Sequence, residues 1–440
     1  MKTNSFFLAL FLITCLFQSC NNNRQEATKP LETSEYIVIM TEEFEKSLPK
    51  YTKGNTDGLL KKNVDSIRLI ELNSFLREMD VKETMVKYKH VNVIVGFSAE
   101  LDSSQVHKIR SNGNTVVKDI RIQMSEPIMQ SEPIMQSEPI MQNEEGLASC
   151  YDFDLESRTS CAVSHAGGPA DGSNSDKKVW IIDTGVDAGH TDLNVITDPN
   201  EGAKSFIGGS AFEDDHGHGT HIAGIIGAKN NDFGITGVSA GAKIIPIKIL
   251  DSEGYGTWSD LIAALVHIEQ KASSGDVVNL SLGAKDVGGC NNPNHFVKKA
   301  IQNLVDEKGV YVVISAGNIG TLGNSHIYDR DANKHLAGCT NGNNIHTVSA
   351  IRCNGDCWSY SNLGVPPVDW VAVGTKVFST WPRNSEGQNM YRVISGTSMA
   401  AAVVSGIIHA NDGPPECGGN VTCGEATYNI AVLQEIEECM

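Results

Sequence analysis

An uninterrupted apolar run leads directly into a carboxylate and a glycine in the segment Val179-Trp180-Ile181-Ile182-Asp183-Thr184-Gly185, and this segment determines the class of fold. Such a run is typical of a central strand in a parallel sheet, where helices bury both faces. Asp183 would then lie at the carboxyl end of the strand, the edge at which open α/β sheets place their reactive groups. The stretch therefore predicts an α/β fold with a functional acid at the edge of its sheet.

Two further glycine-rich segments each open an apolar helix and each carry a reactive side chain. His218 precedes the segment Gly219–Gly227, and Ser398 precedes the alanine-rich segment Met399–Ile408. A serine hydroxyl is a weak nucleophile, so it needs a base within hydrogen-bond reach and an acid that orients that base. Asp183, His218 and Ser398 supply the acid, the base and the nucleophile in that chain order. A nucleophile at a helix N-terminus also lies near backbone N–H groups that favour negative charge.

Together these segments resemble the motifs of the subtilisin-like serine proteases, the subtilases. The resembling segments are Ile182–Gly185, His218–His221 and Ser395–Ala400. The resemblance implies a three-layer α/β sandwich with a mostly parallel sheet, and endopeptide hydrolysis through an acyl-enzyme on Ser398. Each segment alone has an ordinary alternative, since Asp-Thr-Gly ends many strands and serine after Gly-Thr is often a turn. Their order and their apolar flanks favour the family.

Further segments resemble the parts of the family that contact the substrate. Asn318 follows the apolar run Val310–Ile314, and the family's asparagine at this place donates to the oxyanion, with the Ser398 N–H as the second donor. The segments Ser281-Leu282-Gly283 and Gly254-Tyr255-Gly256 resemble the two that pair with an extended peptide. Main-chain pairing gives affinity for any peptide, while side-chain pockets give selectivity. The alternatives are a turn at the asparagine, and an ordinary strand and turn at the two segments.

The loop after the His218 helix resembles the calcium loop of the family. The matching ligands are the side chains of Asp192 and Asn231 and the carbonyl oxygens of Phe233 and Ile235. Hard oxygen ligands in a tight loop suit calcium, so we expect a structural calcium ion and no catalytic cofactor. The family's additional ligand near the start of its domain has no identifiable counterpart in this chain, and a polar turn is the alternative.

The chain begins with a leader that indicates export. Residues 1–20 contain the apolar run Phe6–Phe17, which is too short to span a bilayer and is typical of a signal peptide. The residues around Cys20 resemble a bacterial lipobox, which implies lipidation of Cys20 and an anchor on the cell envelope. Simple secretion is the alternative, and both place the protein outside the cytoplasm.

Residues 21–124, with a core at 36–122, resemble the inhibitory propeptide of subtilases. An N-terminal inhibitor would block the enzyme before export and could assist the slow folding of a parallel sheet. The chain would then be a zymogen whose own propeptide is its first partner, and an independent binding module is the alternative. The expected elements are strands at Tyr36–Met40 and Val91–Phe97 and helices at Asp57–Met79 and Ser103–Ile109.

A perfect six-residue repeat follows, in which Ser125–Gln130, Ser131–Gln136 and Ser137–Gln142 each read Ser-Glu-Pro-Ile-Met-Gln. A proline in every copy forbids a long helix and disfavours a central strand. We interpret residues 125–149 as a flexible linker that carries the activation cut, and residues 150–440 as the catalytic domain. A duplicated insertion without a role is the alternative. The position of the cut does not follow from the sequence.

Composition fits an exported globular enzyme. The formal net charge of −18 argues against a nucleic-acid partner. Of the 11 cysteines, all but Cys15 and Cys20 lie from Cys150 onward, so disulfides formed in an oxidising compartment are expected. Spacing does not decide which cysteines are bonded to each other. A zinc site is the alternative for Cys353 and Cys357. The pairs near enough for local bridges are Cys150–Cys161, Cys353–Cys357 and Cys417–Cys423, with Cys439 left over.

The expected function is that of a secreted serine endopeptidase, a monomer that acts on proteins or peptides. Two alternatives use the same residues: a subtilase-shaped binding protein with weak catalysis, and a peptide ligase. Ala402 keeps both open, because the family usually has a proline at this place in the helix after the nucleophile. A proline there shapes the helix through its fixed φ and its missing N–H.

Overall fold

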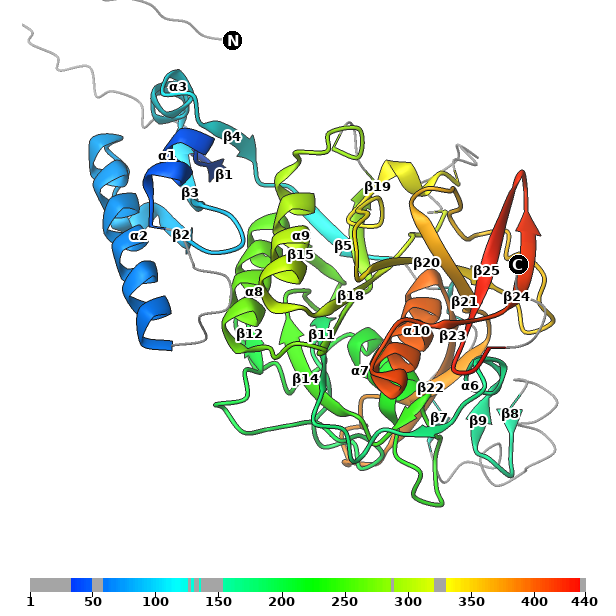
Figure 1. Ribbon diagram of the computed structural model, residues 1–440. Helices are drawn as coiled ribbons and strands as arrows, with labels where there is room; N and C mark the ends of the chain where they lie inside the picture. Colours follow the sequence, from blue (N-terminus) through cyan, green and yellow to red (C-terminus); the bar gives the residue numbers. More distant parts are fainter. Residues whose placement is uncertain are drawn as a thin grey trace, which may run out of the picture.

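The computed structural model describes residues 33–49, 58–125, 128–129, 134–135, 153–285, 289–319 and 330–435. The expected signal peptide, Cys20, Cys150 and Cys439 lie outside these ranges, as does most of the repeat. A small N-terminal unit, blue in Figure 1, lies against a larger C-terminal unit. Within the described ranges, no helix has both the length and the apolar character that a membrane span requires.

The N-terminal unit contains a four-stranded antiparallel sheet in the order β2-β3-β1-β4. Its strands are β1 (Thr33–Ile39), β2 (Val86–His90), β3 (Gly96–Asp102) and β4 (Thr115–Lys118), and its helices are α1 (Glu42–Ser47), α2 (Gly58–Glu78), the short 3-10 helix η1 (Glu83–Met85) and α3 (Ser103–Ser111). A capping box between Asp102 and Gln105 starts α3. The strand expected at Val91–Phe97 is wrong in position, because β3 begins at Gly96. Val91, Val93 and Val95 are buried in the loop before it, so burial rather than strand pairing explains that apolar run.

The C-terminal unit is built on a nine-stranded sheet in the order β12-β14-β11-β16-β18-β20-β21-β25-β24. Neighbouring strands are parallel throughout, except in the final hairpin of β24 and β25. The predicted mostly parallel sheet is therefore confirmed. The strands are β11 (Lys178–Asp183), β12 (Lys204–Ser205), β14 (Lys243–Lys248), β16 (Val277–Leu280), β18 (Tyr311–Ser315), β20 (Ile345–Ile351), β21 (Val368–Val373), β24 (Glu416–Cys423) and β25 (Ala426–Val432).

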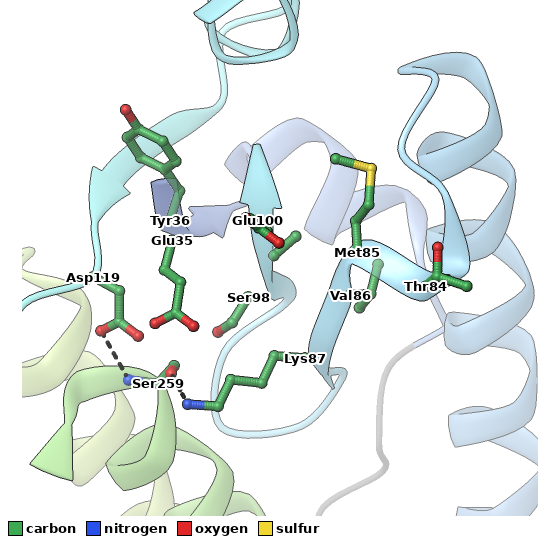
Figure 2. Close-up of a pocket in the computed structure, with 11 residues that line it drawn as sticks. Glu35, Tyr36, Thr84, Met85, Val86, Lys87, Ser98, Glu100, Asp119 and Ser259 are labelled. Atoms are coloured by element: carbon green, nitrogen blue, oxygen red, sulfur yellow. Dashed lines mark hydrogen bonds between the residues drawn. The ribbon is translucent and has the colours of Figure 1, made fainter. Parts of the chain in front are cut away.

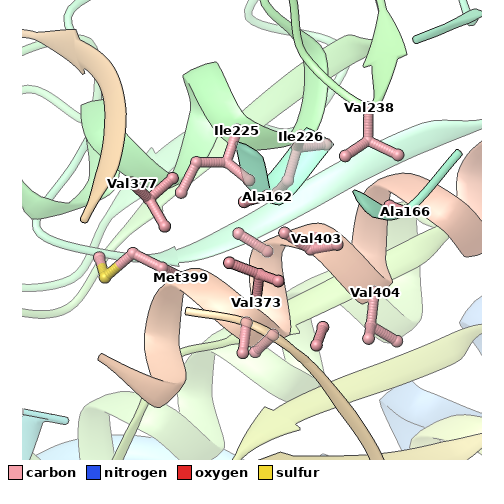
Figure 3. Close-up of a cluster of buried hydrophobic side chains, with 14 of the residues drawn as sticks. Ala162, Ala166, Ile225, Ile226, Val238, Val373, Val377, Met399, Val403 and Val404 are labelled. Atoms are coloured by element: carbon pink, nitrogen blue, oxygen red, sulfur yellow. The ribbon is translucent and has the colours of Figure 1, made fainter. Parts of the chain in front are cut away.

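Alternate residues of β11 face two different helical layers. Val179 and Ile181 share an apolar cluster with α7 (His218–Gly227) and α10 (Thr397–Asn411). Trp180 and Ile182 share another with α8 (Trp258–Lys271) and α9 (Phe296–Lys308). Both faces of the sheet are thus covered, as the apolar run predicted, and the three-layer sandwich is confirmed. Figure 3 shows side chains of α10, with Met399 at its start, packed beside side chains of α7.

Two smaller sheets contain strands from the segment that joins the two units. One has the order β15-β5-β17-β19 and places β5 (Arg121–Met124) between β15 (Tyr255–Thr257) and β17 (Leu282–Lys285). In the other, β6 (Ile128–Met129) and β7 (Ile134–Met135) pair antiparallel with β23 (Met390–Ser395). These parts of the expected flexible linker are therefore strands, because β23 offers them an unpaired edge. The remaining elements are β8 (Phe153–Asp154), β9 (Thr159–Ser160), α6 (Cys161–His165), β10 (Ala170–Asp171), β13 (Ser239–Ala240), the 3-10 helix η2 (Ala332–Lys334), β19 (His335–Leu336) and β22 (Val377–Trp381).

The described disulfides join distant segments rather than neighbours. Their pairs are Cys161–Cys353, Cys290–Cys339 and Cys357–Cys423. The three local pairs suggested by spacing are therefore wrong, because the fold brings residues 192 and 66 positions apart to Cα separations of 6.0 and 5.7 Å. The zinc alternative is also wrong, since both of its cysteines are oxidised. Disulfides of this kind are typical of extracytoplasmic proteins.

Candidate active site

Asp183 and His218 meet at the carboxyl edge of the sheet. Asp183 ends β11 and His218 begins α7, and both side chains are fully buried. The imidazole Nδ1 lies 2.8 Å from Asp183 Oδ1 and 2.9 Å from Oδ2. A carboxylate can only accept, so Nδ1 carries the proton and Nε2 is left as the basic nitrogen. Among the described residues, His218 Nε2 has no hydrogen-bond partner.

Asp214 organises this corner, and sequence reasoning missed it. Its carboxylate accepts hydrogen bonds from the Thr184 hydroxyl at 2.8 Å, from Gly217 N at 2.7 Å and from Thr220 N at 2.8 Å. It therefore ties the residue after Asp183 to the first turn of α7. The side chain is 8% exposed. Asp214 lies three residues before Gly217, the N-cap of α7, and an acidic residue close to the start of an apolar helix is the sequence signal that could have found it.

Ser398 is the second residue of α10 and is fully buried. Its Oγ hydrogen-bonds to the carbonyl oxygen of Ser125 at 3.3 Å, not to His218. Asn318 Nδ2 donates to the same oxygen at 3.3 Å, while Asn318 Oδ1 accepts from Thr397 N at 3.0 Å. A carbonyl oxygen of the chain itself thus accepts from both the hydroxyl and the amide. In the described part of the chain, the expected second donor, the Ser398 N–H, makes no hydrogen bond to this oxygen.

The residues before Ser125 form β5, which pairs antiparallel on both sides. Gln123 is opposite Tyr255 and Ile122 is opposite Gly256, while Met124 is opposite Leu282. The pairing continues beyond the strand, because Met124 N donates to Gly254 O at 3.0 Å and Ser125 N donates to Ser281 O at 3.1 Å. These are the two segments that the sequence suggested for peptide binding. An extended peptide between two strands is a recurring mode of peptide recognition.

Tyr255 faces the start of β5. The Arg121 guanidinium carbon lies 4.0 Å from the centre of the Tyr255 ring, a cation–π contact. Ile122 is 1% exposed and belongs to the apolar cluster that contains Leu250 and Trp258. The bulky Tyr255 therefore borders the space between β15 and β17 that β5 fills, called the groove below, next to a buried isoleucine.

The N-terminal unit contacts the first turn of α8 beside this groove. Lys87 Nζ lies 3.0 Å from Asp260 Oδ1, and the Tyr88 hydroxyl donates to the same oxygen at 2.8 Å. The Asp119 carboxylate accepts from Ser259 N at 3.2 Å, so it provides an acceptor for one of the N–H groups at the start of α8 that have no partner within the helix. Burial raises the pKa of Asp119. Figure 2 shows the cavity at this contact, where Ser259 hydrogen-bonds to both Asp119 and Lys87.

Asp192 and Asn231 lie together in the loops beside α7. Asp192 Oδ2 accepts from Ile235 N at 3.0 Å and from the Tyr391 hydroxyl at 3.3 Å. Asp192 Oδ1 and Asn231 Oδ1 are buried without hydrogen-bond partners among the described residues. Burial raises the pKa of Asp192 to about 6. Two orphaned oxygens, one of them on a desolvated carboxylate, fit the donor set that calcium prefers.

No cluster of three or more His, Cys, Asp and Glu side chains suited to a metal occurs within the described ranges. The expected calcium ligands contain one such side chain together with an amide and two backbone carbonyls. The absence of such a cluster therefore does not test the expected calcium site. The fit rests on the orphaned oxygens.

Comparison with known proteins gives the family. The model of the Subtilase family matches residues 174–409, more than half of the chain. Subtilisin DY of Bacillus licheniformis is 35% identical over 230 residues, which cover 52% of this chain and 74% of that protein. M-protease of Shouchella clausii is 34% identical over 237 residues, 53% of this chain and 53% of its own length.

A crystal structure of a cold adapted subtilisin-like serine proteinase aligns with a TM-score of 0.46 and 26% identity, and covers 57% of this chain and 84% of that one. The family match includes the three segments that carry Asp183, His218 and Ser398, and it ends near the last residue of α10. By its sequence the chain belongs to the subtilase family, the subtilisin-like serine peptidases.

Proposed function

We propose that this chain is an extracytoplasmic serine endopeptidase made as a zymogen, in which the N-terminal unit blocks the groove until the chain cuts itself after Ser125. The observation that carries the proposal is the place of the Ser125 carbonyl. It accepts from Asn318 Nδ2 and from Ser398 Oγ, and its strand pairs on both sides with the C-terminal unit. A binding protein would have no need to hold a peptide carbonyl against a buried hydroxyl.

The proposed mechanism follows from the hydrogen bonds of these groups. Ser398 Oγ attacks the carbonyl carbon of the bound peptide while His218 Nε2 removes its proton. Asp183, bonded to Nδ1, fixes the tautomer that leaves Nε2 basic and stabilises the imidazolium that forms. Asn318 stabilises the negative charge that develops on the carbonyl oxygen. His218 then protonates the leaving amine, and water hydrolyses the acyl-enzyme.

Ser398 must turn from the Ser125 oxygen toward His218 before it reacts. His218 Nε2 can accept this hydrogen bond, because it has no partner among the described residues and the other ring nitrogen is already bonded to Asp183. Hydrogen bonds in a resting site often tighten only in the reactive complex. The geometry therefore supports a poised zymogen rather than a completed triad.

The N-terminal unit is proposed to act as inhibitor through β5 and through its contacts with α8. Cutting after Ser125 would leave β5 as a product strand in the groove, held also by Lys87, Tyr88 and Asp119. The long-range disulfides support a site of action outside the cytoplasm. Lipidation at Cys20 remains part of the proposal.

Calcium would be held by the Asp192 and Asn231 side chains with the carbonyl oxygens of Phe233 and Ile235. A bound cation would neutralise the buried Asp192 carboxylate and would fix the loop after α7, the helix that carries His218. Its proposed contribution is to stability, and no step of the reaction uses it.

The test combines an active-site probe with a protein substrate. A fluorophosphonate should label the purified wild type and should fail to label Ser398→Ala, whereas the exposed Ser273→Ala control should label normally. The wild type should also digest denatured casein. If the folded wild type is neither labelled nor active on casein, the chain is a binding protein and the proposal is wrong.

A further inference from the structure

The strand in the groove displays four residues before the bond that would be cut. They are Ile122-Gln123-Met124-Ser125, and Glu126-Pro127 follows them in the sequence. Ile122 is 1% exposed and Ser125 is 3% exposed, whereas Gln123 is half-buried. The groove therefore buries Ile122 and Ser125 most fully and also Met124, which is 7% exposed, whereas Gln123 is only partly enclosed.

The neighbourhoods of these two side chains differ in kind. Ile122 belongs to an apolar cluster with Leu250, so its place rewards a branched apolar side chain. The Ser125 hydroxyl lies 2.7 Å from the Ser315 hydroxyl in a fully buried setting, so its place accepts a small polar side chain. Reading from the cut, the groove combines a small hydroxyl residue at the bond with an isoleucine three residues earlier.

The repeat contains the same combination again, in the same spacing. Ile128-Met129-Gln130-Ser131 is followed by Glu132-Pro133, and Ile134-Met135-Gln136-Ser137 is followed by Glu138-Pro139. Each copy has isoleucine three residues before serine and Glu-Pro directly after it. Only the two middle positions differ: Gln123-Met124 in β5 corresponds to Met129-Gln130 and to Met135-Gln136 in the repeat. In a fourth partial copy, Ile140-Met141-Gln142 leads to Asn143 instead of serine.

We propose that the groove selects a serine with an isoleucine three residues before it, and that the repeat, in which Glu-Pro follows each such serine, is a tandem array of three substrates for the enzyme itself. The proposal rests on the proposed function. Each cut breaks one Ser–Glu amide bond: the serine acyl group passes to Ser398, the glutamate amine leaves with a proton from His218, and one water releases the acid. Cuts at all three bonds free the hexapeptide Glu-Pro-Ile-Met-Gln-Ser.

The pairing of the repeat with β23 sets the order of these cuts. Ile128 is opposite Ser395 and Ile134 is opposite Tyr391, on the strand that leads to Ser398. While these residues pair there, they cannot also lie between β15 and β17, where β5 now is. The bond after Ser125 is therefore cut first, and the inner bonds are cut after the N-terminal unit and the β23 pairing have been released. Each cut leaves a new N-terminus that begins Glu-Pro, so trimming does not change the first residues of the mature protein.

The test uses the mature enzyme and an acetylated peptide of residues 128–136, Ile-Met-Gln-Ser-Glu-Pro-Ile-Met-Gln. Mass spectrometry should find one cut, between Ser131 and Glu132. Replacing the first isoleucine by aspartate (Ile128→Asp) should lower kcat/KM by about tenfold to a hundredfold, because the charged side chain loses the burial of an isoleucine. The matched peptide with Met129→Asp should change little, since that position corresponds to the half-buried Gln123.

The full-length chain supplies the second measurement. Purified wild type should yield mature N-termini at Glu126, Glu132 and Glu138 together with the free hexapeptide, and Ser398→Ala should yield none of them. A single N-terminus and an uncut peptide, from enzyme that digests casein and reacts with the serine probe, would overturn the tandem array and leave the proposed function standing. Equal rates for the Ile128→Asp and Met129→Asp peptides would overturn the selectivity. Loss of casein digestion as well would overturn both.

Discussion

Ser398 Oγ lies 3.3 Å from the carbonyl oxygen of Ser125, a residue 273 positions earlier in the chain. The contact joins two segments that are far apart in the chain, because Ser125 directly follows β5 and Ser398 lies at the start of α10. Asn318 completes it by donating to the same oxygen from the loop that follows β18. A substrate-like strand, a nucleophile and an amide donor therefore meet where the carboxyl edge of the sheet and the first turns of α7 and α10 converge, which is the arrangement that acyl transfer requires.

Removing the Asn318 side chain should lower kcat far more than it raises KM. The amide stabilises charge that exists only in the transition state, and one such donor is worth roughly 10²–10³ in kcat, a figure that itself comes from a subtilisin. Steady-state kinetics of mature Asn318→Ala on a peptide ester would measure the loss.

The control for Asn318 separates catalysis from packing, because Asn318 Oδ1 also accepts from Thr397 N. Asn318→Asp keeps an acceptor for Thr397 but offers no donor when ionised. We expect it to lose at least as much kcat as the alanine variant. Wild-type kcat in Asn318→Asp would show that the amide supports the helix and not the oxyanion.

Much of the fold could be predicted from local patterns. The apolar run before Asp183 gave the central strand and its two buried faces, and the apolar segments after His218 and Ser398 gave α7 and α10. The same patterns could not identify loops whose apolar side chains are buried in the core. The valines of the segment before Gly96 alternate like those of a strand, yet they are buried as loop residues, because burial and strand pairing leave the same trace in a single sequence.

The contacts of the site depended on tertiary structure in a further way. Nothing local to Ser125 marks it as the residue whose carbonyl meets Ser398, because that contact depends on how β5 registers between β15 and β17. The disulfides show the same limit, since Cys357 bonds to Cys423 across the edge of the sheet and not to its near neighbour Cys353. Sequence spacing measures the distance along the chain, and the fold replaces it with a distance in space.

Asp214→Ala should destabilise the C-terminal unit and also lower kcat. The carboxylate accepts from Thr184, Gly217 and Thr220, so its loss leaves several buried donors unsatisfied around the Asp183–His218 pair. We expect the free energy of unfolding to fall by about 3 kcal/mol, the size typical of a lost network of charge-assisted hydrogen bonds. Urea unfolding of the Ser398→Ala background would measure it. The neighbouring Asp215→Ala is the matched control, because Asp215 is 57% exposed and its pair with Lys248 should contribute less than about 1 kcal/mol.

Calcium should stabilise the mature protein through Asn231. At calcium concentrations near 100 times Kd, a single site adds about 2.7 kcal/mol of stability, which corresponds to roughly 5–10 °C in Tm for a unit of this size. Calorimetry with and without a chelator should show this difference in the wild type. Asn231→Ala should abolish most of it, whereas the adjacent exposed Asn230→Ala should keep it. The same chelator effect in both variants would place the ion elsewhere or deny it.

Acid should weaken the N-terminal unit through His90. This imidazole is 1% exposed, with Ser98 Oγ at 3.3 Å, and burial lowers its pKa from 6.5 to about 3. Below pH 6.5 His90 therefore binds a proton in the unfolded chain but not in the folded unit, so the free energy of unfolding falls as the pH falls from 6.5 toward 3. At pH 5 the loss should be about 2 kcal/mol, since each pKa unit corresponds to about 1.4 kcal/mol.

Calorimetry of the uncut Ser398→Ala chain at pH 7 and pH 5 should show the first transition moving to lower temperature in acid. His90→Gln should shrink that shift, because the variant has no proton to bind, while His107→Gln, an exposed histidine on α3, should leave it unchanged. An identical shift in all three proteins would show that other groups set the acid sensitivity of the unit.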